Sequence, residues 1–229
     1  MQTLAQRFLT ADEQERIART VEEAERRTTG EIVPMVVSAS HAYPEAVLTG
    51  AAVLSLPAAL IAAVTTGSLL WWQDQFLWLF LAFLLLFFPL ARLLMRLPFL
   101  LRPFISERRA AAEVERAAVN RFYREGLQDT RDATGVLIYV SVLERRVWIL
   151  GDRGINERLE PQVWQGFVDT LVTGIREDRA GEALCQVIEE VGALLHAHFP
   201  PRADDRNELA NLLIAGEDGA LARRTLIVQ

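Results

Sequence analysis

Residues 151–154 read Gly-Asp-Arg-Gly and follow the apolar stretch "WIL", so two opposite charges stand between two glycines. An arginine in such a turn can clamp a phosphate or a carboxylate, and glycines allow backbone N–H groups to face an anion. Gly151, Arg153 and Gly154 are therefore candidate anion-binding residues. The alternative is a structural turn in which Asp152 caps a helix or pairs with an arginine. The turn matches neither G-x-G-x-x-G nor a Walker motif.

Three carboxylates give a candidate metal site. Glu31 opens an apolar run, Asp152 lies in the turn, and Glu157 follows the turn. If the strand that begins at Glu31 lies beside the hairpin strands, these side chains converge. Hard cations prefer oxygen ligands, and calcium takes about six to eight of them. Calcium or another divalent cation is thus the candidate cofactor, while an exposed, solubilising Glu31 is the alternative.

No residue pattern indicates a catalytic group. His196 and His198 are two residues apart, which on a helix directs them to different faces, unlike the histidines of H-E-x-x-H. Cys185 falls within the apolar pattern of a helix, where a buried thiol is expected. All 24 basic residues are arginine, so a Schiff-base lysine and a P-loop lysine are excluded. We therefore assign no catalytic residue.

The elements that position these residues follow from capping and periodicity. Thr10 and Glu13 have the spacing of a capping box, and apolar residues follow on one helical stripe. "EIVPMVVS" is typical of a buried strand, which needs neighbours to be stable in water. The pattern predicts strands at 31–38, 135–142 and 145–152 and helices at 106–132, 161–175 and 180–197, with a largely irregular tail after Pro201. Helices flanking such strands indicate an α/β fold, an αβα sandwich around a small mixed sheet. The strand at 31–38 is expected to dock beside the hairpin strands.

Two uncharged segments indicate a transmembrane helical hairpin. Residues 46–64 carry no charge, and residues 76–91 form a second apolar run that ends at Arg92. A membrane helix needs about 20 apolar residues, and arginines at its end can extend the span by snorkelling. Basic residues follow the second run, whereas the link between the runs has only Asp74. The positive-inside rule then places both termini in the cytoplasm, with the chain in the cytoplasmic (inner) membrane.

The expected organisation is therefore a domain interrupted by a membrane insertion: residues 1–45 and 102–201 form the αβα domain, 46–101 the hairpin and 202–229 a C-terminal tail. The net charge of −6 argues against nucleic-acid binding, which needs a basic face. The expected partners are the lipid bilayer and another membrane protein. Small residues in the first apolar run also suggest a homo-oligomer, since they allow helices to pack closely: Gly50, Ala51, Ala52, Ala58, Ala59 and Ala62.

Three segments together resemble the TPM domain family, in particular its bacterial branch with a two-helix membrane insertion. They are "TTGEIVPMVVSAS", "TGVLIYVSVLERRVWILGDRGINERL" and "RNELANLLI". The resemblance extends over about residues 10–215 and implies an αβα sandwich. For plant members it implies acid phosphatase activity or a role in photosystem repair, with calcium near acidic residues. This chain departs from that pattern, since Asp152 and Arg153 occupy the turn and Glu160-Pro161 the later acidic position.

These observations favour a membrane-anchored cytosolic domain that is a non-enzymatic interaction or membrane-protein maintenance module. Two alternatives remain open. One is a divalent-metal-dependent acid phosphatase that uses Glu31, Asp152 and Arg153. The other is an oligomeric membrane scaffold built on the hairpin.

Overall fold

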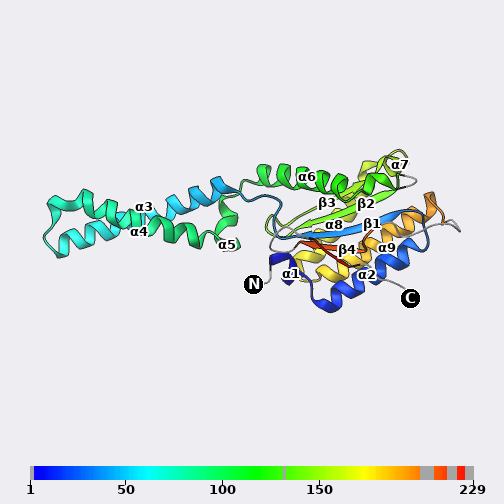
Figure 1. The fold of residues 1–229 in the computed structure, drawn as a ribbon, viewed down its shortest axis with the longest axis horizontal. Coiled ribbons are helices and arrows are strands. Elements are labelled where there is room, and N and C mark those ends of the chain that lie inside the picture. Colours follow the sequence, from blue (N-terminus) through cyan, green and yellow to red (C-terminus); the bar gives the residue numbers. More distant parts are fainter. Residues whose placement is uncertain (1–2, 131–132, 202–208, 216–220, 225–229) are drawn as a thin grey trace. The chain divides into compact units, whose positions relative to one another are not determined.

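The computed structural model describes residues 3–130, 133–201, 209–215 and 221–224 (Figure 1). The chain divides into two compact units. One unit combines Met1–His41 with Ala111–Gln229, and the other is Ala42–Ala110. Each unit is described by itself below.

A five-stranded mixed sheet forms the centre of the first unit, with the order β3-β2-β1-β4-β5. The strands are β1 (Glu31–Val37), β2 (Gly135–Ser141), β3 (Arg146–Gly151), β4 (Leu212–Ala215) and β5 (Leu221–Arg224). β1 is parallel to both β2 and β4, while β2–β3 and β4–β5 are antiparallel pairs. The prediction that the first strand docks beside the hairpin is confirmed, since β1 pairs with β2 from Glu31↔Gly135 to Val37↔Ser141.

The prediction of an irregular tail is wrong in two places, because β4 and β5 belong to the sheet. Each of these strands has only four residues, too few for a period-of-two pattern to be recognised in the sequence. β4 is stabilised instead by β1, to which Leu213 and Ile214 pair. The sheet therefore gains two strands from a segment with little local signal.

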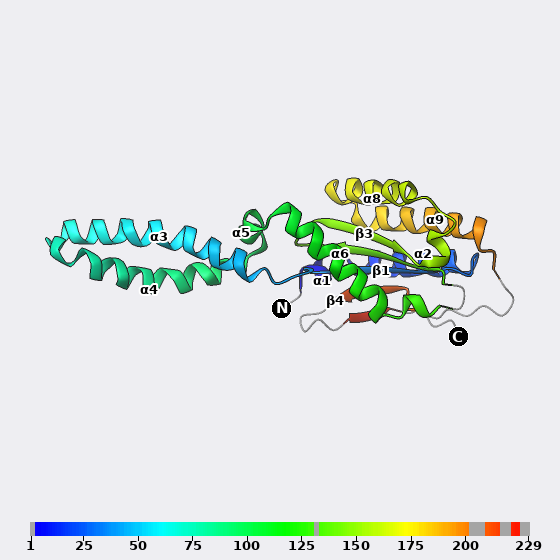
Figure 2. The ribbon, with the colours of Figure 1, turned by 90° about the horizontal axis from the view of Figure 1, so that it is seen from above.

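Helices cover both faces of this sheet, which confirms the αβα sandwich (Figures 1 and 2). On one face lie α1 (Leu4–Phe8), α2 (Ala11–Glu25), α8 (Pro161–Arg176) and α9 (Ala180–His198), over a core that includes Ile32, Val36, Val136, Ile138, Leu184 and Ile188. On the other face lies α6 (Glu107–Arg124), whose Val114, Ala118 and Phe122 pack on Val33, Met35 and Leu137. Alternate side chains of β1, β2, β3 and β4 thus enter opposite cores.

Local capping explains where these helices begin and end. Thr10 accepts from the Glu13 N–H, and the Glu13 carboxylate accepts from the Thr10 N–H, as the capping box predicts. The helix predicted over 106–132 ends earlier, at Arg124, because Gly126 adopts φ +76° and the turn η3 (Leu127–Asp129) follows. A left-handed glycine is a common helix terminator. A one-turn helix, α7 (Arg153–Asn156), was not predicted.

The second unit is a helical hairpin of α3 (Pro44–Leu69) and α4 (Phe76–Leu94), joined through η1 (Gln73–Gln75) and followed by α5 (Pro98–Leu101) and η2 (Arg102–Phe104). Both long helices have the length and hydropathy to cross a membrane. Only 28% of the most apolar window of α3, and 6% of that of α4, is buried within the chain. Large apolar side chains such as Leu69, Leu85 and Trp71 are exposed.

Small residues of α3 are buried where the two hairpin helices pack. Gly50, Ala51, Ala59, Ala63 and Gly67 lie on this buried stripe. A Cβ atom added at Gly50 would lie 2.4 Å from the Met95 sulfur. Several small residues that suggested an oligomer are therefore used for packing within the hairpin itself.

Candidate functional site

The Gly-Asp-Arg-Gly turn lies at the end of β3 and leads into α7. Asp152 caps α7, since its Oδ1 accepts from the Arg153 N–H at 2.6 Å. The Asp152 N–H donates to the Gly135 carbonyl at 2.8 Å, and the Gly154 N–H donates to the Ala133 carbonyl at 3.0 Å. The three N–H groups of residues 152–154 thus have acceptors inside the chain. Anion binding at this turn would depend on side chains.

Gly151 is required here for packing. A Cβ atom at this position would lie 2.8 Å from Cζ2 of Trp164 on α8. The Gly151 carbonyl also accepts from the Asn156 side chain at 2.5 Å, which ties the end of β3 to α7. The glycine therefore allows α8 to approach the strand closely.

A cleft of about 500 Å³ opens beside this turn. It is formed where the chain enters β1 and β2, where α7 begins, and where α9 ends. Its lining consists of Thr29, Ala133, Arg153, Gly154, Glu157, Arg158, His198, Phe199, Pro200 and Pro201. This lining contains two arginines and one histidine but only one acidic residue, Glu157. The cleft therefore suits an anionic ligand better than a cation.

The two arginines of the cleft are held differently. Arg158 is fixed, because its Nη1 donates to the His198 carbonyl at 2.7 Å and its guanidinium lies 4.5 Å from the centre of the Phe199 ring. Arg153 is exposed and lies 3.3 Å from Glu157, which is exposed as well. An exposed pair of this kind contributes little stability, so an incoming anion can compete for Arg153.

The proposed metal ligands have separate roles. Glu31 is 6% exposed at the start of β1, Asp152 caps α7, and Glu157 pairs with Arg153. Within the described residues, no three histidine, cysteine, aspartate or glutamate side chains are grouped as a metal would require. Since calcium takes about six to eight oxygens, a calcium site on these three carboxylates would need further ligands, and it stays a prediction.

Glu31 belongs to a polar cluster with Asn211, which is buried, and Glu25, which is partly buried. The sequence did not predict this cluster. The Glu25 carboxylate accepts from the Ile32 N–H at 2.9 Å, and the Asn211 amide lies 3.5 Å from its other oxygen. Burial first, and then the charge of the hydrogen-bonded Glu31, raise the pKa of Glu25 well above its usual range. The sequence did contain a sign that Glu25 faces the protein. Glu25 follows Val21 by four residues on the same helix, so the two side chains lie on one face, and Val21 is buried.

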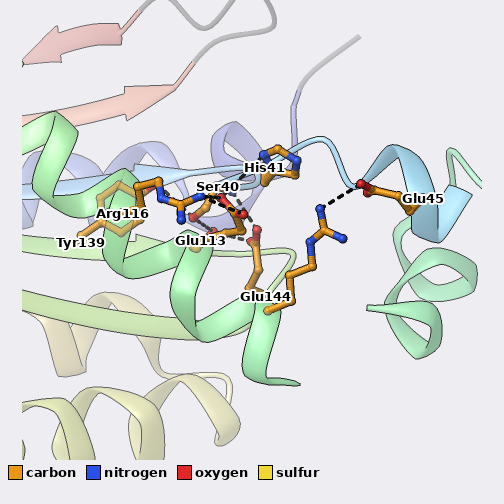
Figure 3. A network of polar contacts seen from close by, with 9 residues as sticks. Ser40, His41, Glu45, Glu113, Arg116, Tyr139 and Glu144 are labelled. Carbon is orange, nitrogen blue, oxygen red and sulfur yellow. Dashed lines mark hydrogen bonds and ion pairs between the residues drawn. The ribbon is translucent and has the colours of Figure 1, made fainter. Parts of the chain in front are cut away.

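A second polar network lies at the opposite end of β1 and β2 (Figure 3). The Ser40 hydroxyl donates to Ser141 at 2.9 Å and lies 3.1 Å from the Tyr139 hydroxyl. Glu144 accepts from the Ser40 N–H at 2.8 Å and from the Ser141 hydroxyl at 2.5 Å. Burial is the main reason that the pKa of Tyr139 is raised. These bonds fix the segment after β1 to the β2–β3 turn.

Charged residues extend this network onto α6. His41 Nδ1 lies 3.8 Å from Glu113, which also pairs with Arg116 at 3.2 Å (Figure 3). His41, the residue just before the hairpin unit, thereby contacts α6 through Glu113. No motif in the sequence pointed to this network, because its members come from segments far apart.

The remaining candidate residues, His196, His198 and Cys185, lie in different parts of the fold. His196 Nδ1 lies 2.5 Å from the Arg27 carbonyl oxygen, so it links α9 to the end of α2. His198 lines the cleft. Cys185 is partly buried and packs against the core under α9.

Comparison with known proteins supports the fold. Residues 105–194 match the sequence profile of the TPM domain. The NMR structure of the BA42 protein from the psychrophilic bacterium Bizionia argentinensis has a similar fold, with a TM-score of 0.55 and 22% sequence identity. The similarity covers 89% of this chain and 92% of BA42. No curated protein matches the chain. The resemblance to the TPM domain is thus confirmed for residues 105–194.

Proposed function

We propose that this chain is a membrane-anchored αβα domain that binds a partner at the cytoplasmic face of the inner membrane. The observation that carries the proposal is the exposure of α3 and α4. A helix buried in a soluble core hides most of its apolar surface, whereas the most apolar window of α4 is only 6% buried. A lipid bilayer supplies the missing apolar surroundings.

Arginine placement supports the orientation. Arg92, Arg96 and Arg102 follow the most apolar part of α4, whereas the link between the helices contains Asp74 and no basic residue. The positive-inside rule then assigns the αβα unit to the cytoplasm. Because two crossings return the chain to its starting side, both parts of the sheet reach the same compartment.

The anchor is tested by fractionation and reporter fusions. The full chain should remain in membranes after alkaline carbonate extraction. Reporters fused before residue 41 and after residue 111 should report the cytoplasm, and one inserted at residues 70–75 the other side. Extraction into the soluble fraction, or reporters placing residues 41 and 111 in different compartments, would refute the anchor.

Partner binding is tested by capture from native membranes with the full chain as bait. A reproducible membrane-protein partner that is retained by the full chain, and lost when only the hairpin is used as bait, is the expected result. Capture that depends on the hairpin alone would contradict a role for the αβα unit.

The cleft favours one alternative, hydrolysis of a phosphoester, because Arg153, Arg158 and His198 line it. The TPM family resemblance implies the same activity for its plant members. The test is turnover of a generic aryl phosphate by the full chain, with and without divalent metal. Activity that is lost in Arg158→Ala, and in Asp152→Asn if a metal is needed, would replace the binding-module proposal with an enzymatic one.

A further inference from the structure

Residues 92–109 run from the last turn of α4 to the first turn of α6 and carry a concentrated positive charge. The segment contains five arginines and one acidic residue, Glu107. The arginines are Arg92, Arg96, Arg102, Arg108 and Arg109. The link between α3 and α4, at the other end of the hairpin, contains Asp74 and no basic residue. All the positive charge of the hairpin unit therefore belongs to this one segment.

Packing within the hairpin unit places residues 95–104 at the end where α3 begins and α4 ends (Figures 1 and 2). Ala51 of α3, Ala91 of α4 and Met95 form a small core, against which Leu100 and Phe104 pack. The segment after α4 is thus held against the hairpin that precedes it, so its charges stay at this end.

The arginines of this segment are accessible to a ligand. Within the part of the chain that the structure describes, only Arg109 of the five forms an ion pair. Its partner, Glu45, lies 3.1 Å away, and because both side chains are exposed the pair contributes little stability. Arg102 is half-buried, and the other four arginines are exposed. A guanidinium group can bind a phosphate through two parallel hydrogen bonds.

Two exposed apolar side chains lie between Arg96 and Arg102. Phe99 on α5 is 71% exposed, and Leu97, just before α5, is 42% exposed. Leu101, by contrast, is buried. Exposed apolar side chains with arginines on both sides are typical of a segment that lies in a membrane interface, where the ring enters the acyl boundary and the guanidinium groups stay among the headgroups.

We propose that residues 92–109, which we call the arginine patch, bind the phosphate groups of anionic phospholipids. This inference rests on the proposed function, because it requires that α3 and α4 cross a bilayer. It adds a preference for one class of lipid to the anchor. Each arginine near an anionic membrane surface strengthens binding about fivefold.

The depth of the arginines in the membrane agrees with a headgroup ligand. Arg92 and Arg96 are four residues apart, so they are separated by at most about 6 Å along the axis of α4. The headgroup region of one leaflet is about 5–7 Å thick. Both guanidinium groups can therefore lie in this layer while the apolar part of α4 stays in the hydrocarbon.

The apolar side chains favour a lipid over an acidic segment of a partner protein. A phospholipid offers phosphate to the arginines and acyl chain to Leu97 and Phe99, whereas an acidic peptide in water offers charge alone. The combination of exposed arginines with an exposed ring between them thus matches an anionic lipid.

Lipid quenching of a fluorophore at residue 99 tests this preference. In a background in which Cys185, the one cysteine of the chain, is serine, Phe99→Cys is labelled with bimane in the full chain. The chain is reconstituted in phosphatidylcholine vesicles that contain nitroxide-labelled phosphatidylglycerol or nitroxide-labelled phosphatidylcholine. Phosphatidylglycerol should quench at an about fivefold lower content than phosphatidylcholine, and high salt should reduce this difference.

A label at the other end of the hairpin is the matched control for position. Trp71 is 88% exposed and lies in the link that has no arginine. Bimane on Trp71→Cys should be quenched equally by the two lipids at low and at high salt.

Charge variants in the bimane-labelled Phe99→Cys chain identify the residues that cause the preference. Arg96→Gln/Arg102→Gln should bring the two lipids close to equal quenching at residue 99, whereas Arg96→Lys/Arg102→Lys should keep most of the preference because it keeps the charge. Arg124→Gln/Arg176→Gln removes two exposed arginines from the αβα unit and should leave the preference unchanged.

The outcomes separate this inference from the membrane anchor. Equal quenching at residue 99 in a chain that resists carbonate extraction would overturn the arginine patch and leave the anchor in place, whereas release of the chain by carbonate would remove both. A preference that survives Arg96→Gln/Arg102→Gln would also refute the patch. If the two lipids quench equally and the same substitutions abolish capture of a membrane protein, the arginines bind an acidic partner and the lipid proposal is wrong.

Discussion

The pair of the partly buried Glu25 and the buried Glu31 makes a strong prediction about pH. Glu25 has a raised pKa in the folded chain, because of burial and the charge of Glu31. Between the ordinary glutamate pKa of 4.5 and the raised folded value, the folded state binds more protons than the unfolded state. This contribution to stability is fully present below pH 4.5 and is lost as the pH rises through the folded pKa.

The size of the effect follows from proton linkage. When the folded state binds one proton more than the unfolded state, the free energy of unfolding falls by at most about 1.4 kcal/mol for each unit rise in pH. For a chain of this length, about 1 kcal/mol changes Tm by about 2–4 °C. The wild-type Tm should therefore fall by up to about 3–6 °C per pH unit across this window from this pair alone.

Glu25→Gln should remove most of this fall of Tm with rising pH. Glutamine stays neutral, its carbonyl can still accept from the Ile32 N–H, and its amide can donate to Glu31. We expect the variant to be more stable than wild type at about pH 8 and to differ less at about pH 5. The assay is thermal unfolding followed by tryptophan fluorescence of the full chain in detergent over this pH range.

The matched control is Glu15→Gln, which makes the same change on the same helix. Glu15 is exposed and pairs with Arg19 one turn later. This control should leave the wild-type slope in place. If Glu25→Gln and wild type show parallel profiles, or if the variant is less stable at high pH, then the pair does not hold a proton as argued.

Other substitutions give further tests of the fold by thermal or denaturant unfolding. Gly135→Ala should cost about 1–3 kcal/mol, because its Cβ would lie 2.5 Å from the Leu127 carbonyl oxygen. The control, Gly166→Ala in α8, has nothing within 4 Å of the added Cβ and should be neutral or stabilising. Glu13→Ala should cost about 1 kcal/mol at neutral pH. The Thr10 N–H lowers the Glu13 pKa, so the difference from wild type should shrink as the pH falls below 4.5; a constant difference would count against the capping role. Asp152→Ala should cost about 1 kcal/mol through loss of the α7 cap, whereas Asp152→Asn should be nearly neutral. Equal losses in both would contradict that role.

Much of the fold was predictable because its signals are local. The valine-rich β1, the β2–β3 hairpin and the capping box at Thr10 each identify an element within a few residues of sequence. The charge-free segments likewise predicted the two long helices. The exceptions, β4 and β5, are short strands whose pairing depends on β1 and on each other.

The polar sites were less predictable, because they depend on distant segments. Glu25 meets Asn211 although the two are 186 residues apart, and Ser40 meets Tyr139 across 99 residues. Periodicity places a residue on a face but does not identify what lies opposite. The expected convergence of Glu31 and Asp152 illustrates this limit, since both lie at one end of the sheet and yet have different partners.

The central position of β1 has a consequence for biosynthesis. Both of its neighbours, β2 and β4, are translated after the 69 residues of the hairpin unit, from Ala42 to Ala110. A nascent chain that has emerged only as far as α4 thus carries an unpaired, apolar strand next to the ribosome. The domain cannot close around β1 until α3 and α4 have left the exit tunnel, so the sheet forms only after the hairpin has been synthesised. A ribosome stalled before Gly135 should hold an amino-terminal segment that proteases digest readily.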